Sequence, residues 1–149
     1  MTVSDLAEGD SDDWRRLWSA WQRHMAGAVP ADVTDRTWKL LLDQSSGLHG
    51  LLARDAHGGA LGFAHASLTP FAWTGGHVLY LQDLFVSRQA RGQGAGAALL
   101  DAVYRLADRL GVTQVYWMVD EADEPLQRFY SRHAVRTPYT RYMRCAWPW

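Results

Sequence analysis

The sequence predicts a mixed α/β fold in a single domain that spans residues 1–149. Helical patterns come first along the chain, an antiparallel run of strands follows, and strands then alternate with helices. This order is typical of one sheet with helices packed against it. The length of 149 residues and the hydrophobic content of 48% suit one domain with a single core.

The elements of the first half follow from the spacing of apolar residues. After a short strand, apolar residues three and four positions apart predict two helices. The pattern then changes to segments rich in β-branched and aromatic residues, separated by glycine-containing turns, which predict a hairpin and a third strand. The expected strands span 3–6, 48–54, 60–68 and 77–86, and the expected helices span 12–25 and 32–43.

The second half alternates between strands and helices. Apolar residues at helical spacing follow a glycine-rich segment, and they predict a helix that Gly111 ends. The run Asp-Glu-Pro, which starts helices well, predicts another helix from Asp123. Strands are expected over 112–119, before that helix, and within 139–147, after it.

Composition excludes several classes of function. The net charge is −1 and no long basic block is present, so nucleic-acid binding is not expected. The single cysteine, Cys145, excludes an internal disulfide framework and suits a reducing compartment. Neither a signal peptide nor an apolar run of about 18 residues is present, so we expect a cytoplasmic protein without membrane contact. The six histidines, His65 and His77 among them, lack paired ligand spacing, so no metal is expected.

Four large apolar residues recur at helical spacing near the start of the chain. Trp14, Trp18, Trp21 and Met25 lie on one face of the first expected helix. One interpretation is a stripe that faces the core. The other is an aromatic wall around a cationic ligand, because tryptophan offers the best face for a cation–π contact. Both can hold at one edge of a helix.

The segment RQARGQGAGAALL, residues 88–100, places glycines at alternate positions directly before a helix. A helix entrance presents unpaired N–H groups at the positive end of the helix dipole, an arrangement that binds phosphate. A triphosphatase loop is excluded, because Ala97 and Ala98 stand where Lys and Ser or Thr are needed. A dinucleotide site remains an alternative, with Asp120 as the ribose-binding acid. Glycines that serve packing alone are another.

Arg91, Gly94 and Gly96, which follow the strand LYLQDLFV, favour a different interpretation. In this context the pattern R-x-x-G-x-G resembles the acyl-CoA-binding motif of the GNAT superfamily of N-acetyltransferases. The later text VYWMV and DEPLQRFYSRHA resembles the next strand of that family and its helix N-x-x-A-x-x-[LF]-Y. The two motifs cover residues 79–134 in the right order, and they are nearest in pattern to the diamine (spermidine/spermine) acetyltransferases and similar small-amine enzymes.

This resemblance implies a GNAT fold, with a central, mostly antiparallel sheet whose splayed strands hold an acyl-CoA between flanking helices. Acetyl-CoA is then the co-substrate. The backbone amides of residues 91–96 would hold the CoA pyrophosphate, and the preceding strand would hydrogen-bond the pantetheine arm in the gap beside residues 115–119. The cofactor-binding residues implied are Leu84, Phe85, Val86, Arg91, Gly92, Gln93, Gly94, Ala95, Gly96 and Asp123.

Tyr130 occupies the position of the family's general acid. Its hydroxyl, with an ordinary pKa of about 10, can donate to a departing thiolate whose pKa is about 8.5. The alternative is that Phe129 and Tyr130 are core aromatics of the last helix. Asp123 stands where relatives commonly carry asparagine, so it either contacts CoA or only caps its helix.

The usual general base of the polyamine enzymes is missing. Gln82 stands where they carry a glutamate, and an amide cannot accept the amine proton. Asp83 is acidic, but the alternation of a strand predicts that it lies on the opposite face from Gln82. The acids at 120, 121, 123 and 124 would draw a cationic acceptor toward Tyr130, or they simply suit a helix N-terminus.

The expected function is transfer of an acetyl group from acetyl-CoA to the primary amine of a polyamine-like or amino-acid-like molecule. An alternative is a non-catalytic acyl-CoA-binding or regulatory module of the same fold, which Gln82 favours. A protein N-acetyltransferase is a further alternative. Dimers are frequent in the resembled family, so a homodimer is also expected.

Overall fold

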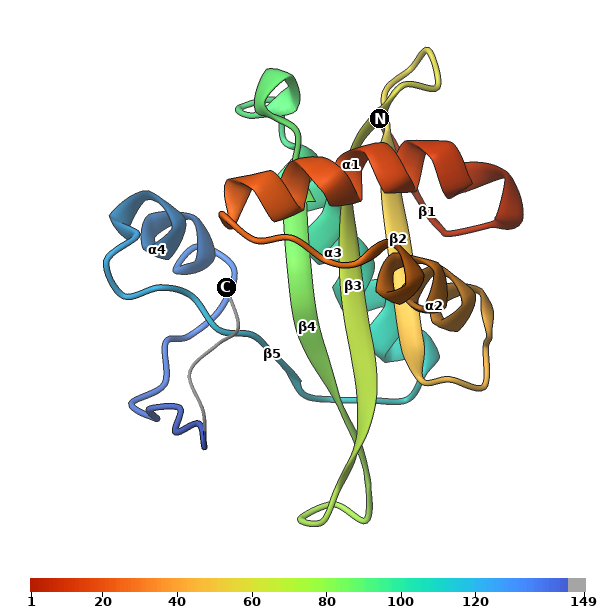
Figure 1. Cartoon of the computed structure of the whole chain (residues 1–149). Coiled ribbons are helices and arrows are strands. Elements are labelled where there is room, and N and C mark those ends of the chain that lie inside the picture. The colour runs from red at the N-terminus through yellow and green to blue at the C-terminus, as the bar shows by residue number, and fades with distance from the viewer. Residues whose placement is uncertain (145–149) are drawn as a thin grey trace.

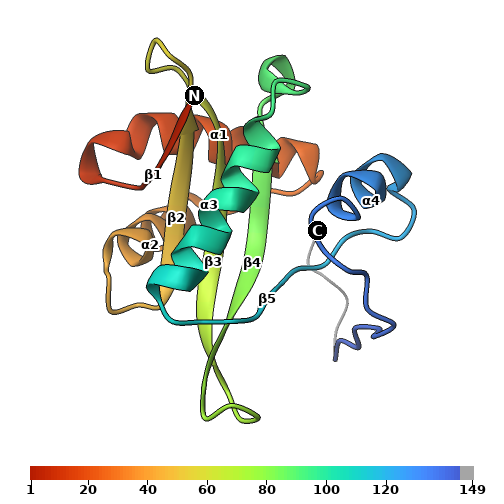
Figure 2. The same cartoon turned by 180° about the vertical axis from the view of Figure 1, so that it is seen from behind.

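The computed structural model describes residues 1–144 and shows a five-stranded sheet with helices on both faces (Figures 1 and 2). The sheet order is β1-β2-β3-β4-β5, in which the first four strands are antiparallel neighbours and β5 is parallel to β4. Helices α1 and α2 cover one face of the sheet, and α3 crosses the other. The mixed α/β fold predicted from the sequence is confirmed.

Element bounds agree closely with the predicted segments in the first half. None of the helices within residues 1–144 is long and apolar enough to cross a membrane. The strands are β1 (Thr2–Asp5), β2 (Leu48–Arg54), β3 (Ala60–Phe71), β4 (Gly76–Val86) and β5 (Val115–Tyr116). The helices are α1 (Ser11–His24), α2 (Ala31–Leu42), α3 (Ala95–Arg109) and α4 (Glu124–Tyr130), with short 3-10 turns η1 (Glu8–Asp10) and η2 (Arg88–Ala90).

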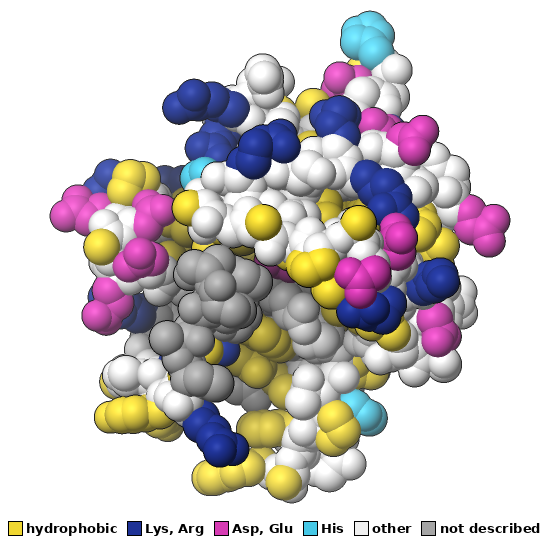
Figure 3. All heavy atoms as spheres, in the orientation of Figure 1, with side chains coloured by type: hydrophobic (Ala, Val, Ile, Leu, Met, Phe, Trp, Pro, Cys, Tyr) yellow, Lys and Arg dark blue, Asp and Glu magenta, His cyan; other side chains and the backbone are white. Residues whose placement is uncertain are grey.

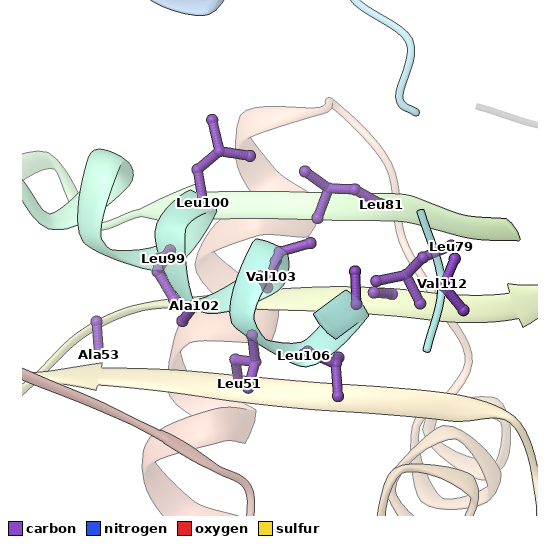
Figure 4. Close-up of a cluster of buried hydrophobic side chains, with 13 residues drawn as sticks. Leu51, Ala53, Leu79, Leu81, Leu99, Leu100, Ala102, Val103, Leu106 and Val112 are labelled. Carbon is purple, nitrogen blue, oxygen red and sulfur yellow. The ribbon is translucent and has the colours of Figure 1, made fainter. Parts of the chain in front are cut away.

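The core lies on both faces of the sheet. On the α3 face, Leu99, Leu100 and Val103 pack against strand residues that include Leu79 and Leu81 (Figure 4). Because these helix residues recur three and four positions apart, α3 presents one apolar stripe to the sheet. Gly111 ends the helix with a φ of +67°, and the N–H of Val112 returns to the carbonyl of Ala107.

The tryptophan-rich face of α1 packs on the opposite side of the sheet. Trp14 and Leu17 are fully buried there, so the stripe faces the core as one interpretation predicted. Burial declines toward the end of the helix, because Trp21 is partly buried and Met25 is exposed. The last turn of α1 therefore presents aromatic surface at the margin of the core.

Two predicted strands differ from the structure. The strand expected over 112–119 is confined to Val115–Tyr116, because the chain then leaves β4 and loses its ladder partner. The final strand expected within 139–147 is not formed over residues 139–144, and the rest of that segment lies outside the described residues. Both predictions relied on β-rich composition, which does not reveal whether a neighbouring strand is available for pairing.

His49 on β2 is half-buried, and its buried ring nitrogen is unsatisfied. Its Nε2 atom has no hydrogen-bond partner within residues 1–144. Burial lowers the pKa of His49 below its ordinary value of 6.5, and the nearby Arg109 acts in the same direction against the opposing effect of Asp5. The native state therefore binds a proton at this site less readily than the unfolded chain does.

This difference predicts a stability loss in weak acid. As the pH falls below about 6.5, the unfolded chain takes up a proton at His49 while the native state does not, so the free energy of unfolding decreases. We expect His49→Leu to flatten this decrease in urea denaturation curves. His77→Leu, which removes an exposed histidine of β4, is the matched control. Equal slopes for the wild type and His49→Leu would contradict the prediction.

Candidate active site

The second half of β4 has an unpaired outer edge. β5 pairs with β4 at Leu79 and Tyr80 alone, and beyond that point residues 81–86 face no strand on this side within residues 1–144. Figure 1 shows the chain diverging from β4 toward α4. Alternate residues of a strand direct their N–H and C=O groups to opposite edges. Part of the backbone of Leu84–Val86 is therefore free to bond a ligand.

A β-bulge lies at the point where the two strands part. His65 of β3 pairs with Asp83, but its neighbour Ala66 pairs with Leu81, which leaves Gln82 as the extra residue of β4. Leu81 and Leu84 both contact the core on the α3 face, so two residues lie between them in place of one. The alternation on which the prediction for Asp83 and Gln82 was based is interrupted here, so their placement on opposite faces stays a prediction.

The glycine segment forms a turn that ends in α3, as predicted. Gly92 and Gly94 have φ angles of +76° and +85°, a region in which residues with a Cβ are strained. An added Cβ would meet nothing within 4 Å at either position, so backbone conformation and not space requires these two glycines. Gly96 is helical, and its added Cβ would lie 3.5 Å from Phe129 Cζ.

The N-terminus of α3 is uncapped by side chains. Gly94 is its N-cap residue, and the first turn contains no acidic residue. The N–H groups of Ala95, Gly96 and Ala97 have no carbonyl partner within the helix and point out of its positive end. Figure 3 shows basic side chains gathered at this edge of the molecule, where the arginines Arg88 and Arg91 are exposed. This end of α3 suits an anion.

Arg91 itself turns back toward the strand. Its Nε atom donates a 3.3 Å hydrogen bond to the carbonyl of Val86, and Gln93 bonds the carbonyl of Gln89. The side chains of the loop thus stabilise the turn. The backbone N–H of Arg91 bonds the carbonyl of Arg88, whereas those of residues 92–97 have no carbonyl partner within residues 1–144 and are left for a ligand.

Helix α4 packs against the start of α3. Besides the approach of Phe129 to Gly96, the hydroxyl of Tyr104 donates to the carbonyl of His133 at 3.1 Å, just beyond α4. The approach of Phe129 to Gly96 brings the last helix to the entrance of α3, although the two motifs are distant in the sequence. The unpaired edge of β4 (residues 81–86), the glycine loop (residues 91–96) and α4 therefore adjoin one another. A shallow cavity of about 380 Å³ beside Tyr104 and Val115 lies away from this loop.

Tyr130 is the last residue of α4 and is largely buried. Its ring lies 5.0 Å from that of Trp117 and packs against the core on the α3 face. Burial raises the pKa of Tyr130 to about 12, with a smaller contribution from Tyr104. The hydroxyl therefore stays protonated across the physiological range. It makes no hydrogen bond within residues 1–144, so this donor is available.

The acidic residues before α4 are engaged locally. Asp123 caps the helix by accepting a 3.0 Å bond from the N–H of Leu126, as one interpretation predicted. Asp120 accepts from the N–H of Ala122, whereas Glu121 and Glu124 pair with arginines. All four acids are exposed, and Figure 3 shows acidic side chains at the surface over α4. Capping and ion pairing account for the cluster, and the CoA contact of Asp123 remains a prediction.

A buried polar chain links α1 to the bulge, and the sequence analysis missed it. Trp14 Nε1 donates to His65 Nε2 at 2.9 Å, His65 Nδ1 lies 3.0 Å from Asp83 Oδ2, and Trp21 Nε1 donates to Asp83 Oδ1 at 2.9 Å. A polar residue within an apolar strand and donor-bearing tryptophans on the facing helix were the available signals. Their pairing depends on tertiary structure, because the partners lie 18 to 62 residues apart.

Comparison with known proteins decides the family. The model of the acetyltransferase (GNAT) family matches residues 8–134. The chain belongs to the GNAT family. It is therefore an acyltransferase of the kind that uses acetyl-CoA, as the glycine motif and the Tyr130 helix predicted.

GNAT relatives resemble the chain over nearly its whole length. The D-amino-acid N-acetyltransferase HPA3 of Saccharomyces cerevisiae (strain ATCC 204508 / S288c) is 33% identical over 145 residues, which cover 97% of this chain and 90% of the yeast protein. The crystal structure of a probable acetyltransferase has a TM-score of 0.86 at 16% identity and covers 98% of both chains. AAC(6')-Iy, solved with a bisubstrate analogue of CoA, has a TM-score of 0.82 at 21% identity and covers 97% of both chains. These two structures support the fold, and the diamine/polyamine likeness remains a prediction.

Proposed function

We propose that this GNAT protein transfers an acetyl group from acetyl-CoA to the primary amine of a small molecule. One observation carries the proposal: the uncapped entrance of α3 adjoins an edge of β4 that, within residues 1–144, has no partner strand beyond Tyr80. The entrance of α3 suits phosphate groups, and the unpaired edge of β4 suits the amides of a pantetheine arm. Few other ligands combine a pyrophosphate with a peptide-like arm.

The residues of the chain fit acetyl-CoA in that position. The N–H groups of residues 92–96 would hold the pyrophosphate, with the exposed side chains of Arg88 and Arg91 adding positive charge at the rim. The free backbone groups of Leu84–Val86 would bond the arm. When bound, acetyl-CoA supplies an acetyl thioester, which an uncharged amine attacks.

Two groups of the chain can assist that attack. A backbone N–H at Leu84 or Phe85 would stabilise the negative charge that develops on the acyl oxygen. The hydroxyl of Tyr130 would donate a hydrogen bond to the departing sulfur, because its raised pKa keeps it protonated. Neither role requires Tyr130 to ionise.

An amino-acid-like or polyamine-like amine is the proposed acceptor. The yeast relative of 33% identity acts on D-amino acids according to its name, and this supports an amino-acid-like acceptor in particular. The aromatic end of α1, near Trp21, suits a small cationic ligand.

Gln82 favours a second candidate, a non-catalytic acyl-CoA-binding or regulatory module. It is the exposed bulge residue of β4, and its amide cannot remove a proton from an ammonium group. A protein of this kind would bind acetyl-CoA and leave amines unmodified.

A panel of amines separates the two candidates. D- and L-amino acids, aliphatic diamines and an N-terminal peptide are incubated with acetyl-CoA, and free CoA is measured. We expect at least one small amine to raise CoA release about tenfold or more above the amine-free rate. Acetyl-CoA binding by calorimetry without turnover of any amine would support the non-catalytic module. Turnover of the peptide alone would indicate a protein acetyltransferase.

A further inference from the structure

The polar chain between α1 and β4 fixes the hydrogen positions on His65. An indole N–H can only donate, so His65 Nε2 must accept from Trp14. The neutral ring then carries its hydrogen on Nδ1, where it donates to Asp83. His65 is 2% exposed, and a second ring hydrogen would face the N–H of Trp14. His65 is therefore suited to orienting Asp83.

Asp83 receives one donor on each carboxylate oxygen. His65 bonds Oδ2, and Trp21 bonds Oδ1, so two rings from different elements fix the plane of the carboxylate. Both donors are neutral, and no Lys or Arg pairs with Asp83 within residues 1–144. Each oxygen keeps a further lone pair, and the side chain is 20% exposed. In the part of the chain that the structure describes, Asp83 is thus an oriented carboxylate that has no Lys or Arg partner and is partly open to solvent.

Aromatic rings border this charge. The rings of Trp21, His24 and Phe85 lie within 5.7 to 6.2 Å of one another, at the end of α1 that crosses β4 (Figure 1). A carboxylate beside aromatic faces is the chemistry that recognises an alkylammonium group. Asp83 is also adjacent to Gln82 at the bulge, where β4 loses its partner strand.

We propose that Asp83 binds the ammonium group of the acceptor, and that His65 is a positioning residue that orients the Asp83 carboxylate. The inference rests on the proposed function, because it places the acceptor at the end of the strand edge assigned to the acetyl-CoA arm. It identifies the acceptor as a small amine that enters as a cation. It assigns no proton transfer to either residue.

Ligand binding tests the proposal without requiring turnover. Butylamine and benzylamine are titrated by calorimetry into protein saturated with CoA, which has no acetyl group to transfer, and butanol and benzyl alcohol serve as uncharged counterparts. We expect the wild type to bind at least one amine more tightly than its alcohol. We expect Asp83→Asn to weaken amine binding about tenfold and to change alcohol binding much less. The variant loses the negative charge that only the amine uses, together with one of the two bonds from His65 and Trp21.

A matched pair at position 65 tests the positioning role. The amide nitrogen of asparagine can occupy the place of Nδ1 and donate to Asp83, whereas glutamine reaches the place of Nε2 and serves Trp14. Both variants lose one buried bond, so a purely structural role predicts similar effects. We expect His65→Asn to retain most of the preference for amine over alcohol, and His65→Gln to lose it.

The outcomes separate the two proposals. Equal amine binding by the wild type and Asp83→Asn, or no binding of either amine by the wild type, would overturn the assignment of Asp83. Similar loss in both His65 variants would overturn the positioning role. The amine panel with acetyl-CoA tests the proposed function independently, because turnover of an amine together with unchanged binding in Asp83→Asn rejects this inference alone.

Discussion

Gly96→Glu is expected to weaken acetyl-CoA binding at least about 30-fold while leaving the fold intact. Two unit charges about 4 Å apart repel by about 4 kcal/mol at an effective dielectric constant of about 20. Half of that repulsion, allowing for solvent, corresponds to a Kd increase of about 30-fold. A glutamate in the first turn of a helix is itself favourable, so the binding loss is not expected to come from unfolding. Calorimetry with acetyl-CoA measures the effect.

Gly96→Gln is the matched control, because it has nearly the same size and no charge. The added Cβ meets Phe129 at an ordinary contact distance of 3.5 Å in both variants. We expect the glutamate variant to bind acetyl-CoA about tenfold or more weakly than the glutamine variant. Equal affinities in the two variants would contradict a pyrophosphate at this helix entrance. Gly94 is a poorer test position, because its φ of +85° strains any side chain.

Local signals account for the parts of the fold that could be predicted. The spacing of apolar residues located α1, α2 and α3, and the glycine-containing turn located the β2–β3 hairpin. Each of these depends on residues within one element or on an adjacent turn. The motif from β4 into α3 was equally local, because glycines with positive φ angles mark the turn wherever the chain folds.

The parts that could not be predicted depend on contacts between distant segments. The length of β5 is set by the divergence of two strands, and the bulge at Gln82 is set by the register of β3 against β4. The link from Trp14 through His65 to Asp83 joins three elements. Its members were visible separately as an aromatic stripe, a histidine and an acid. Only the packing of α1 on the sheet shows that they bond one another.

Tyr130 is expected to act as a hydrogen-bond donor that does not ionise during turnover. Its pKa of about 12 exceeds that of a thiol, about 8.5, by roughly 3.5 units, so full proton transfer would be unfavourable by about 5 kcal/mol. A hydrogen bond to a charged partner nevertheless stabilises it by about 1.5–3 kcal/mol. The raised pKa also implies that ionisation of Tyr130 does not lower kcat below about pH 11.

Tyr130→Phe is therefore expected to lower kcat about 10- to 100-fold, with the Kd for acetyl-CoA almost unchanged, since the hydroxyl contributes mainly once the sulfur carries charge. Tyr104→Phe is the control, because it removes a hydroxyl that bonds the carbonyl of His133, and it is expected to lower thermal stability more than kcat. Free-CoA release across the pH range measures both variants. Unchanged kcat in Tyr130→Phe would make Tyr130 a core aromatic. A different result would show that the hydroxyl ionises: a fall in the kcat of the wild type near pH 10 that is absent from Tyr130→Phe. Titration of the hydroxyl would then remove the donor in the wild type, as the substitution already does in the variant.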